Sequence, residues 1–365
     1  MLAQLIALAA AAAAPVPSAE LAGVWEGNVG NLPVRACFVR RDTEWFGDYY
    51  YLSRLQLIPL EAEGNGGGFR ETADAGTDLP RWTIGSVGAA EMTARWSNGT
   101  RTLPIHLRRL ARMTGDDSPC ASALFHRPRL EGLRTLRSRA AIDGVAYTKL
   151  TLDLRGRFDS RFESFALDGS DAAAQRINAA LAQGLAGDPP SWFECIGDSL
   201  GYSPREGAFE ESLAPTMISR RWLAVAHHWD GDCGGAHPDS SNTYRVFDLA
   251  DGREIDLHDW LNGEAVHRER PEGGSEELKS LRPAFRDAIL AGWRPEDAEC
   301  DEPVRSEEFW TIGLTRSGLV FSPELPHVVQ SCSADIVVPL ARLRPWLSPE
   351  GAANLRALEA EAARR

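Results

Sequence analysis

The sequence predicts an α+β protein in which an antiparallel all-β domain precedes an α+β domain with an antiparallel sheet and two or three helices. Two observations support this fold class. Residues 20–112 consist of short runs rich in aromatic and β-branched residues, separated by Gly, Asn and Asp, which is typical of strands joined by turns. Beyond residue 128, strand-like runs alternate with stretches that carry apolar residues at helical spacing.

The expected domain boundaries follow changes in composition. The apolar run Met1–Ala14 precedes Pro and small residues; it suits a signal-peptide core and falls short of the roughly 20 residues that span a membrane. No later run approaches that length, so we expect no membrane span in the mature chain. We expect a signal peptide at residues 1–19, an antiparallel β domain at 20–112, a linker at 113–127, an α+β domain at 128–347 and a C-terminal helix at 348–365.

Period-two alternation defines the strands of the first domain. Leu103, Ile105 and Leu107 alternate with polar residues and a proline, which predicts a sheet with one buried face. In the second domain, Ser170 or Asp171 begins a helix that places Ile177 and Leu181 on one face. A short strand is expected over residues 192–196.

The stretch Ala226–Trp260 is the centre of the second domain. It predicts a strand, a Gly-rich turn, a second strand, a tight Asp251–Gly252 turn and a third strand. Four later elements are expected. They are a helix over residues 276–290 that Pro283 kinks or divides, a hairpin over 309–322, a last strand over 334–340 and a helix over 348–365 that begins at Ser348–Pro349.

Charge and cysteine content narrow the class of protein. The net charge of −13 argues against a general nucleic-acid binder. Six cysteines in a chain with an export signal predict disulfides and a periplasmic or secreted location. Fifteen pairings are possible, and spacing alone does not choose among them. Our hypothesis is sequential pairing within domains, namely Cys37–Cys120, Cys195–Cys233 and Cys300–Cys332.

Polar and aromatic residues crowd the Gly-rich turn of the central stretch. A metal site is one interpretation, but His227 and His228 are adjacent on a strand and therefore point to opposite faces. We expect no metal and no cofactor. A purely structural turn and a binding loop remain as alternatives, and the candidate partner-binding residues are Trp229, Asp230, Asp232 and His237.

A second motif suggests a different chemistry. Gly197-Asp-Ser-Leu-Gly201 matches the nucleophile-elbow pattern of serine hydrolases, in which a strand precedes the serine and a helix follows it. The alternative function is therefore a serine esterase with Ser199 as nucleophile and His327 or His237 as base. The segment after Ser199 is a poor helix start, which weighs against this alternative.

Several motifs in order carry a family resemblance. They are GSDAAAQRINAAL, WLAVAHH, CGGAHPDSSNTYRVFDLADGREIDLHDWL, FWTIGLTRSGLVFSPELPHVV and DIVVPLARLRPWL. Residues 149–347 resemble an extracytoplasmic α+β domain of unknown function, found in lysozyme-sensing anti-sigma factors and beside peptidoglycan deacetylase domains. The run GVWEGNVGNLPVRACF followed by GDYYY resembles a small β module of exported bacterial proteins.

The resemblance implies an exported, non-enzymatic module that binds a macromolecule. We therefore expect a non-catalytic protein that binds or senses a cell-envelope component or a partner protein, such as a basic lysozyme. The negative charge suits that partner through electrostatic steering. A serine esterase and a structural envelope protein are the alternatives.

Overall fold

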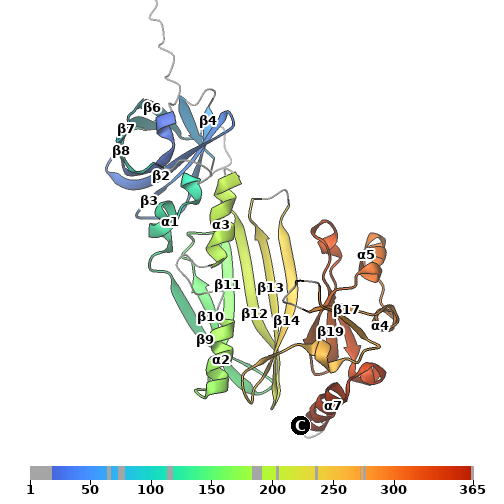
Figure 1. Ribbon diagram of the computed structural model, residues 1–365. Coiled ribbons are helices and arrows are strands. Elements are labelled where there is room, and N and C mark those ends of the chain that lie inside the picture. The colour runs from blue at the N-terminus through green and yellow to red at the C-terminus, as the bar shows by residue number, and fades with distance from the viewer. Residues whose placement is uncertain are drawn as a thin grey trace, which may run out of the picture.

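The computed structural model describes residues 19–63, 67–72, 79–112, 118–182, 191–202, 205–234, 237–271, 273 and 277–362. The expected signal peptide, except for residue 19, and the start of the expected linker lie outside these ranges. Figure 1 shows a barrel at one end of a long sheet, and a third group of elements packed beside that sheet. The fold class is α+β, as predicted.

The N-terminal part is a closed antiparallel barrel. Its strands are β1 (Gly23–Val29), β2 (Leu32–Arg41), β3 (Glu44–Tyr51), β4 (Ile58–Glu63), β5 (Gly68–Glu71), β6 (Arg81–Val87), β7 (Glu91–Ser97) and β8 (Thr102–Ala111). Trp25, Phe38, Phe69 and Trp82 are fully buried in one core cluster, so large aromatic rings fill the barrel. The antiparallel β prediction is confirmed.

The segment expected as a linker is partly structured. It contains a 3-10 turn, η2 (Pro119–Ala121), and the helix α1 (Ala123–Leu130), which the sequence analysis missed. The Ser122 hydroxyl accepts a hydrogen bond from the Phe125 N–H and caps α1. The Phe125 ring packs against Tyr50 of the barrel, with ring centroids 5.2 Å apart. This segment is therefore docked onto the barrel.

A seven-stranded sheet follows, in the order β15-β14-β13-β12-β11-β10-β9. The strands are β9 (Arg134–Ile142), β10 (Val145–Asp153), β11 (Ser160–Leu167), β12 (Ala208–Ile218), β13 (Trp222–Asp232), β14 (Asp239–Asp248) and β15 (Glu254–Ile255). β11 and β12 are parallel, whereas the other neighbours are antiparallel. The prediction of an antiparallel sheet is therefore wrong for this pair, because a crossover through two helices joins the strands.

The two crossover helices are α2 (Ala172–Leu181) and α3 (Ser191–Tyr202). The Asp171 side chain caps α2, as one of the two predicted N-caps. The strand expected over residues 192–196 is wrong. Trp192, Ile196 and Leu200 recur every four residues and are buried, so this segment forms a helix with one apolar face.

The central stretch folds largely as predicted. β13 and β14 form a long hairpin, and Gly252 takes a positive φ of 73° in the turn before β15. A Cβ at Gly252 would lie 2.5 Å from the Ala173 carbonyl oxygen, so the turn needs glycine in order to dock on α2. The third strand is only two residues long and leads into the 3-10 helix η4 (Leu257–Trp260).

The C-terminal part packs against the face of the sheet opposite to α2. Trp222 and Ala224 of β13 belong to its core, whereas Leu223 and Val225 belong to the core beneath α2. Its elements are β16 (Val266–Glu269), β17 (Leu278–Leu281), α4 (Pro283–Ile289), α5 (Asp301–Ser306), β18 (Trp310–Leu314), β19 (Gly318–Pro323), β20 (Ile336–Pro339), α6 (Leu340–Leu343) and α7 (Pro349–Ala362). The late hairpin, the last strand and the helix after Ser348 match their predictions.

The helix expected over residues 276–290 is wrong in its first half. Leu278–Leu281 pairs with β16 as the strand β17, and the helix α4 begins only at Pro283. Proline is favoured in the first turn because its missing N–H has no partner there in any case. The helix count also exceeds the expected two or three, since α3, α4, α5 and α6 join α2 and α7.

Candidate functional site

Three disulfides join Cys37 to Cys120, Cys195 to Cys233 and Cys300 to Cys332. These are the pairs that sequential pairing predicted. The second bridge ties α3 to the end of β13, directly after Asp232 and before the Gly-rich turn. Residues 235–236 of that turn lie outside the described residues. The candidate binding residues therefore surround a covalently fixed strand end.

Trp229 ends a row of aromatic rings that runs across the sheet. Its ring stacks on Phe209 of β12 at a centroid distance of 6.0 Å and an interplanar angle of 22°. Phe209 stacks in turn on Phe162 of β11, and Phe162 contacts the buried Trp192 of α3. Trp229 itself is only half-buried. The row therefore supports an indole with one face in the core and part of its surface in solvent.

Three exposed carboxylates lie at the same strand end as Trp229, on the opposite face of the sheet. Glu210 of β12 and Asp230 of β13 lie directly opposite each other in the antiparallel ladder, and Asp232 follows two residues later. All three are exposed, and none forms an ion pair with any residue that the structure describes. Arg161 of β11 lies next to Glu210, but its guanidinium binds Glu163. Like charges opposite each other destabilise a sheet, so this pair is retained at a cost to stability.

The two adjacent histidines point to opposite faces of β13, as expected. His227 Nε2 lies 2.8 Å from Glu211 Oε1, and His228 Nδ1 lies 2.7 Å from Asn242 Oδ1. Across the described ranges, the metal-ligating side chains come together in a group of three only at Cys37, Asp48 and Cys120. Both sulfurs of that group are in a disulfide, which leaves them unable to act as thiolate ligands.

His237 is exposed at the start of the chain that returns to β14. Its ring lies 5.8 Å from that of His327, and His327 Nδ1 is 3.4 Å from Asp239 Oδ1. The structure therefore brings the two candidate histidines together with a carboxylate. No measured contact links either of them to Ser199.

Ser199 lies inside α3, not on a strand-to-helix turn. Its side chain is 1% exposed; the hydroxyl donates to the Ile196 carbonyl at 2.6 Å and accepts from the Gly207 N–H. A Cβ at Gly234 would lie 2.8 Å from the Ser199 Cα, so the Gly-rich turn packs directly on this serine. The arrangement that a nucleophile elbow requires is therefore not present at Ser199.

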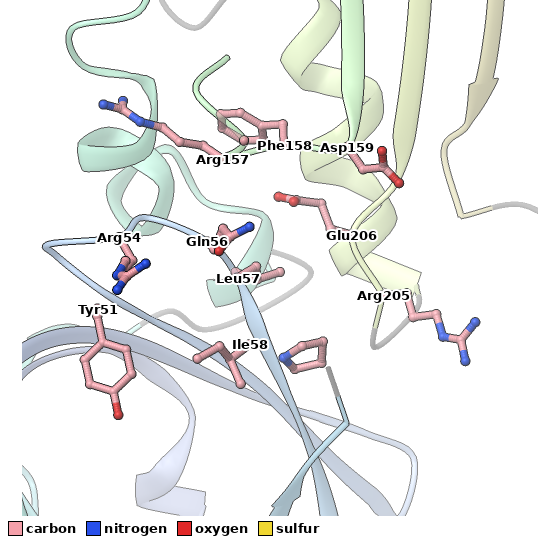
Figure 2. Close-up of a pocket in the computed structure, with 12 residues that line it drawn as sticks. Tyr51, Arg54, Gln56, Leu57, Ile58, Arg157, Phe158, Asp159, Arg205 and Glu206 are labelled. Atoms are coloured by element: carbon pink, nitrogen blue, oxygen red, sulfur yellow. The ribbon is translucent and has the colours of Figure 1, made fainter. Parts of the chain in front are cut away.

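A pocket with a volume of about 780 Å³ lies between the barrel and the sheet. Leu57, Ile58 and Phe158 form its apolar walls, and Glu206 lies at its side. Figure 2 shows the guanidinium groups of Arg157 and Arg205 pointing outward, away from the space between these walls. Arg157 donates instead to the carbonyls of Arg129 and Glu131. Arg157 and Arg205 therefore do not converge on an anion site in this pocket.

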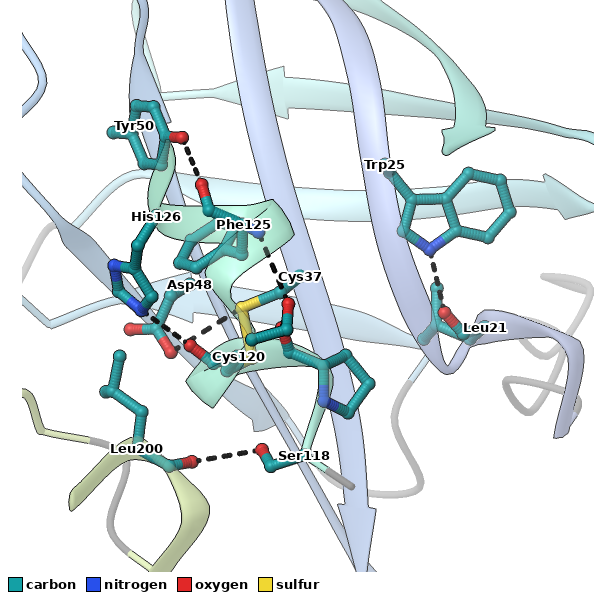
Figure 3. Close-up of a disulfide and its surroundings, with 12 residues drawn as sticks. Leu21, Trp25, Cys37, Asp48, Tyr50, Ser118, Cys120, Phe125, His126 and Leu200 are labelled. Carbon is teal, nitrogen blue, oxygen red and sulfur yellow. Dashed lines mark hydrogen bonds between the residues drawn. A yellow bond between two sulfur atoms is a disulfide. The ribbon is translucent and has the colours of Figure 1, made fainter. Parts of the chain in front are cut away.

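A buried polar cluster next to the first disulfide was missed by the sequence analysis (Figure 3). Asp48 is 2% exposed, and its Oδ2 lies 3.9 Å from Cys37 Sγ. Burial raises the pKa of Asp48 well above its usual range, and the Glu206 carboxylate raises this pKa further. Burial also lowers the pKa of His126 well below its usual range, with Arg129 adding to the effect. Asp48 is therefore held as a neutral acid and His126 as a neutral imidazole.

Replacing Asp48 by Asn is expected to stabilise the protein increasingly as the pH rises. The unfolded state releases the Asp48 proton near pH 4, while the folded state retains it, so the wild type loses stability from about pH 4 up to the folded pKa. D48N carries no such loss and should gain about 1.4 kcal/mol relative to wild type per pH unit in that range. Denaturant unfolding at pH 4, 5 and 6 measures the difference. The exposed Asp42→Asn is the control, and a D48N effect that is constant with pH would contradict the prediction.

Comparisons with known proteins give weak matches only. No family model matches the chain, and no curated protein matches it. Among the solved structures that match are a DUF3298 family protein from Pseudomonas aeruginosa PAO1 and a DUF3298 family member from Bacteroides fragilis NCTC 9343. The first has 13% identity and a TM-score of 0.36, covering 61% of this chain and 97% of its own. The second has 12% identity and a TM-score of 0.35, covering 64% and 99%. At these values neither structure guides the choice of a site.

Proposed function

We propose that this chain is an exported, non-catalytic protein that binds a basic partner protein or another cationic component of the cell envelope. The binding surface is the sheet tip, defined as Glu210, Trp229, Asp230, Asp232 and His237. The observation that carries the proposal is the half-buried Trp229, which stacks on Phe209 at a strand end whose opposite face carries carboxylates without ion pairs. An alternative as a serine esterase loses support from the buried hydroxyl of Ser199.

The chemistry of the sheet tip suits a cationic ligand. An indole face attracts ammonium and guanidinium groups, and the attraction increases when these groups lose water. The carboxylates at the same strand end, on the other face of the sheet, add charge attraction and accelerate encounter with a basic protein. The net charge of −13 acts in the same direction over a longer range.

The covalent cross-links of the fold suit a protein located outside the cytoplasm. Three disulfides are typical of proteins that fold in an oxidising compartment. None of the helices in the described ranges is both long and apolar enough to cross a membrane. The Cys195–Cys233 bridge holds the sheet tip against α3, so little conformational entropy remains to be lost on binding.

The test measures binding of a basic lysozyme and of an oligo-lysine peptide to the intact protein. Trp229→Ala is expected to weaken binding by at least about tenfold, as for an aromatic residue at the centre of an interface. The double variant D230N/D232N should mainly slow association and reduce the dependence on salt. E296Q/E302Q is the matched control, because it removes the same charge from exposed positions near α5.

Two results would overturn the proposal. One is binding of neither probe to the wild type. The other is equal loss of affinity in D230N/D232N and in the E296Q/E302Q control, since this would indicate attraction to net charge rather than recognition at the sheet tip.

A further inference from the structure

The strand β9 leaves one edge of the seven-stranded sheet open (Figure 1). It pairs with β10 over all nine of its residues without a register shift. Its other side pairs with no strand in the described ranges. A long, regular edge strand presents a row of free backbone N–H and C=O groups, which is a template for pairing with another chain.

The hairpin turn identifies which groups are free. Ile142 and Val145 flank the two-residue turn Asp143–Gly144, in which both residues have positive φ. In such a hairpin the flanking residues form a hydrogen-bonded pair, and every second residue from there repeats it. The backbone N–H and C=O groups that point away from β10 therefore belong to the alternate residues Thr135, Arg137, Arg139 and Ala141.

Near the opposite edge of the sheet, side chains from elsewhere in the chain cover part of the β14 backbone. There the side-chain amide of Gln330 binds both the N–H and the carbonyl of Ser240 on β14, as a neighbouring strand would. The Thr311 hydroxyl donates to the carbonyl of Asn242. The chain thus covers the exposed end of β14 with its own side chains, whereas no side chain among the described residues bonds the backbone of β9 in this way.

The side chains of β9 are exposed on both faces of the strand. Leu136 is 53% exposed, although it is a large apolar residue. Arg134 and Arg137 form no ion pair with any described residue, and Arg139 binds Asp168. The open edge therefore combines free backbone groups with a positive charge that contrasts with the net charge of −13.

We propose that β9 binds an extended acidic segment of a partner protein, which adds to the sheet as an eighth strand. Main-chain hydrogen bonds to Thr135, Arg137, Arg139 and Ala141 provide affinity, and the arginine side chains select acidic residues. Charge disfavours a second copy of this chain as the occupant. The antiparallel registers of two β9 strands with the longest overlap, about Arg137, Ser138 or Arg139, place arginine opposite arginine, which is destabilising.

This surface is separate from the sheet tip and selects the opposite charge. It lies on the first strand of the sheet, whereas the sheet tip lies on β12 and β13. A single molecule can therefore engage a cationic and an acidic partner at once. Binding at β9 does not depend on the function proposed for Trp229, so a negative result at one surface leaves the other untouched.

The test uses a fluorescent nine-residue peptide in which Glu alternates with Thr, matched in length to β9. Fluorescence anisotropy with the intact protein measures its binding. We expect the double variant R134E/R137E to weaken binding by about tenfold or more. R95E/R101E is the matched control: it makes the same charge change at exposed positions of the barrel, which has no open edge. The same peptide with an N-methyl group on every residue should not bind, because it then presents N–H donors on neither edge.

Residue-resolved hydrogen exchange then separates strand addition from simple charge attraction. Bound peptide should protect the amides of Thr135, Arg137, Arg139 and Ala141, while the alternate amides of β9 are already bonded to β10. Absence of binding would overturn the proposal. So would binding that tolerates N-methylation or leaves these four amides unprotected, since a polyanion site needs no backbone pairing.

Discussion

Replacing Cys37 and Cys120 together by Ala is expected to lower the free energy of unfolding by about 4–5 kcal/mol. The bridge closes a loop with a sequence separation of 83, the longest of the three. In the chain-entropy model a loop of this length stabilises by about 4.5 kcal/mol, because it restricts the unfolded chain. Both cysteines are fully buried, so the variant also loses packing around them.

The measurement is equilibrium unfolding by guanidinium chloride, followed by fluorescence of the buried Trp25 and Trp82 of the barrel. The matched control is C300A/C332A, which opens a loop with a separation of only 32 and lies in another part of the fold. The model gives about 3.7 kcal/mol for that loop. A barrel that unfolds at the same denaturant concentration with and without the Cys37–Cys120 bridge would contradict the prediction.

Turns, hairpins and helix caps that depend on a few neighbouring residues were predictable from the sequence. The Asp251–Gly252 turn, the hairpin over residues 309–322 and the Ser348 cap each depend on a few neighbouring residues. The disulfide pairs also followed from a local argument, because each cysteine bonds the next one along the chain. Closure of the first domain into a barrel was not predicted, because pairing of β1 with β8 joins residues about 80 apart.

Strands in which apolar and polar residues do not alternate regularly were not predicted. β12 lies at the centre of the sheet, but it carries Glu210, Glu211 and Pro215, and its register shifts between Pro215 and Met217. Such a segment resembles a solvated acidic face, and the sequence alone assigns no strand to it. Glu210 was consequently absent from the candidate site, although it faces Asp230 across the ladder. Recognising β12 as a strand would have placed the Glu210 and Asp230 carboxylates together at the strand end that carries Trp229.

Buried polar residues gave no sequence signal at all. Asp48, His126 and Arg129 belong to residue types that are mostly exposed or intermediate in exposure, and nothing around them in the chain indicates burial. Their contacts are long-range, since Arg129 binds residues 74 and 77 positions away. Only the tertiary structure brings these partners together, and it makes Arg129 the junction between the barrel, α1 and the sheet.

Arg129→Met is expected to destabilise the protein by about 3–5 kcal/mol. This is the usual cost of removing one partner of a buried ion pair while the other charge stays buried. The Arg129 side chain is fully buried and binds both carboxylate oxygens of Glu206, with Nη2 and Oε2 2.8 Å apart. It also donates to the carbonyls of Leu55 and Arg157, and its guanidinium lies 4.2 Å from the Phe158 ring centroid. Methionine fills part of the volume but leaves the carboxylate and both carbonyls without these partners.

Two comparisons distinguish this junction from an ordinary arginine contact. Arg127→Met, in the same helix, removes an exposed pair with Glu131 and should cost less than about 0.5 kcal/mol. The double variant R129M/E206M should be more stable than R129M alone, because it removes the buried carboxylate together with its partner. Chemical unfolding of the wild type, R129M, E206M and R129M/E206M gives the coupling energy. A loss in R129M as small as that in R127M, or additive losses in the double variant, would show that the guanidinium does not hold the barrel and the sheet together.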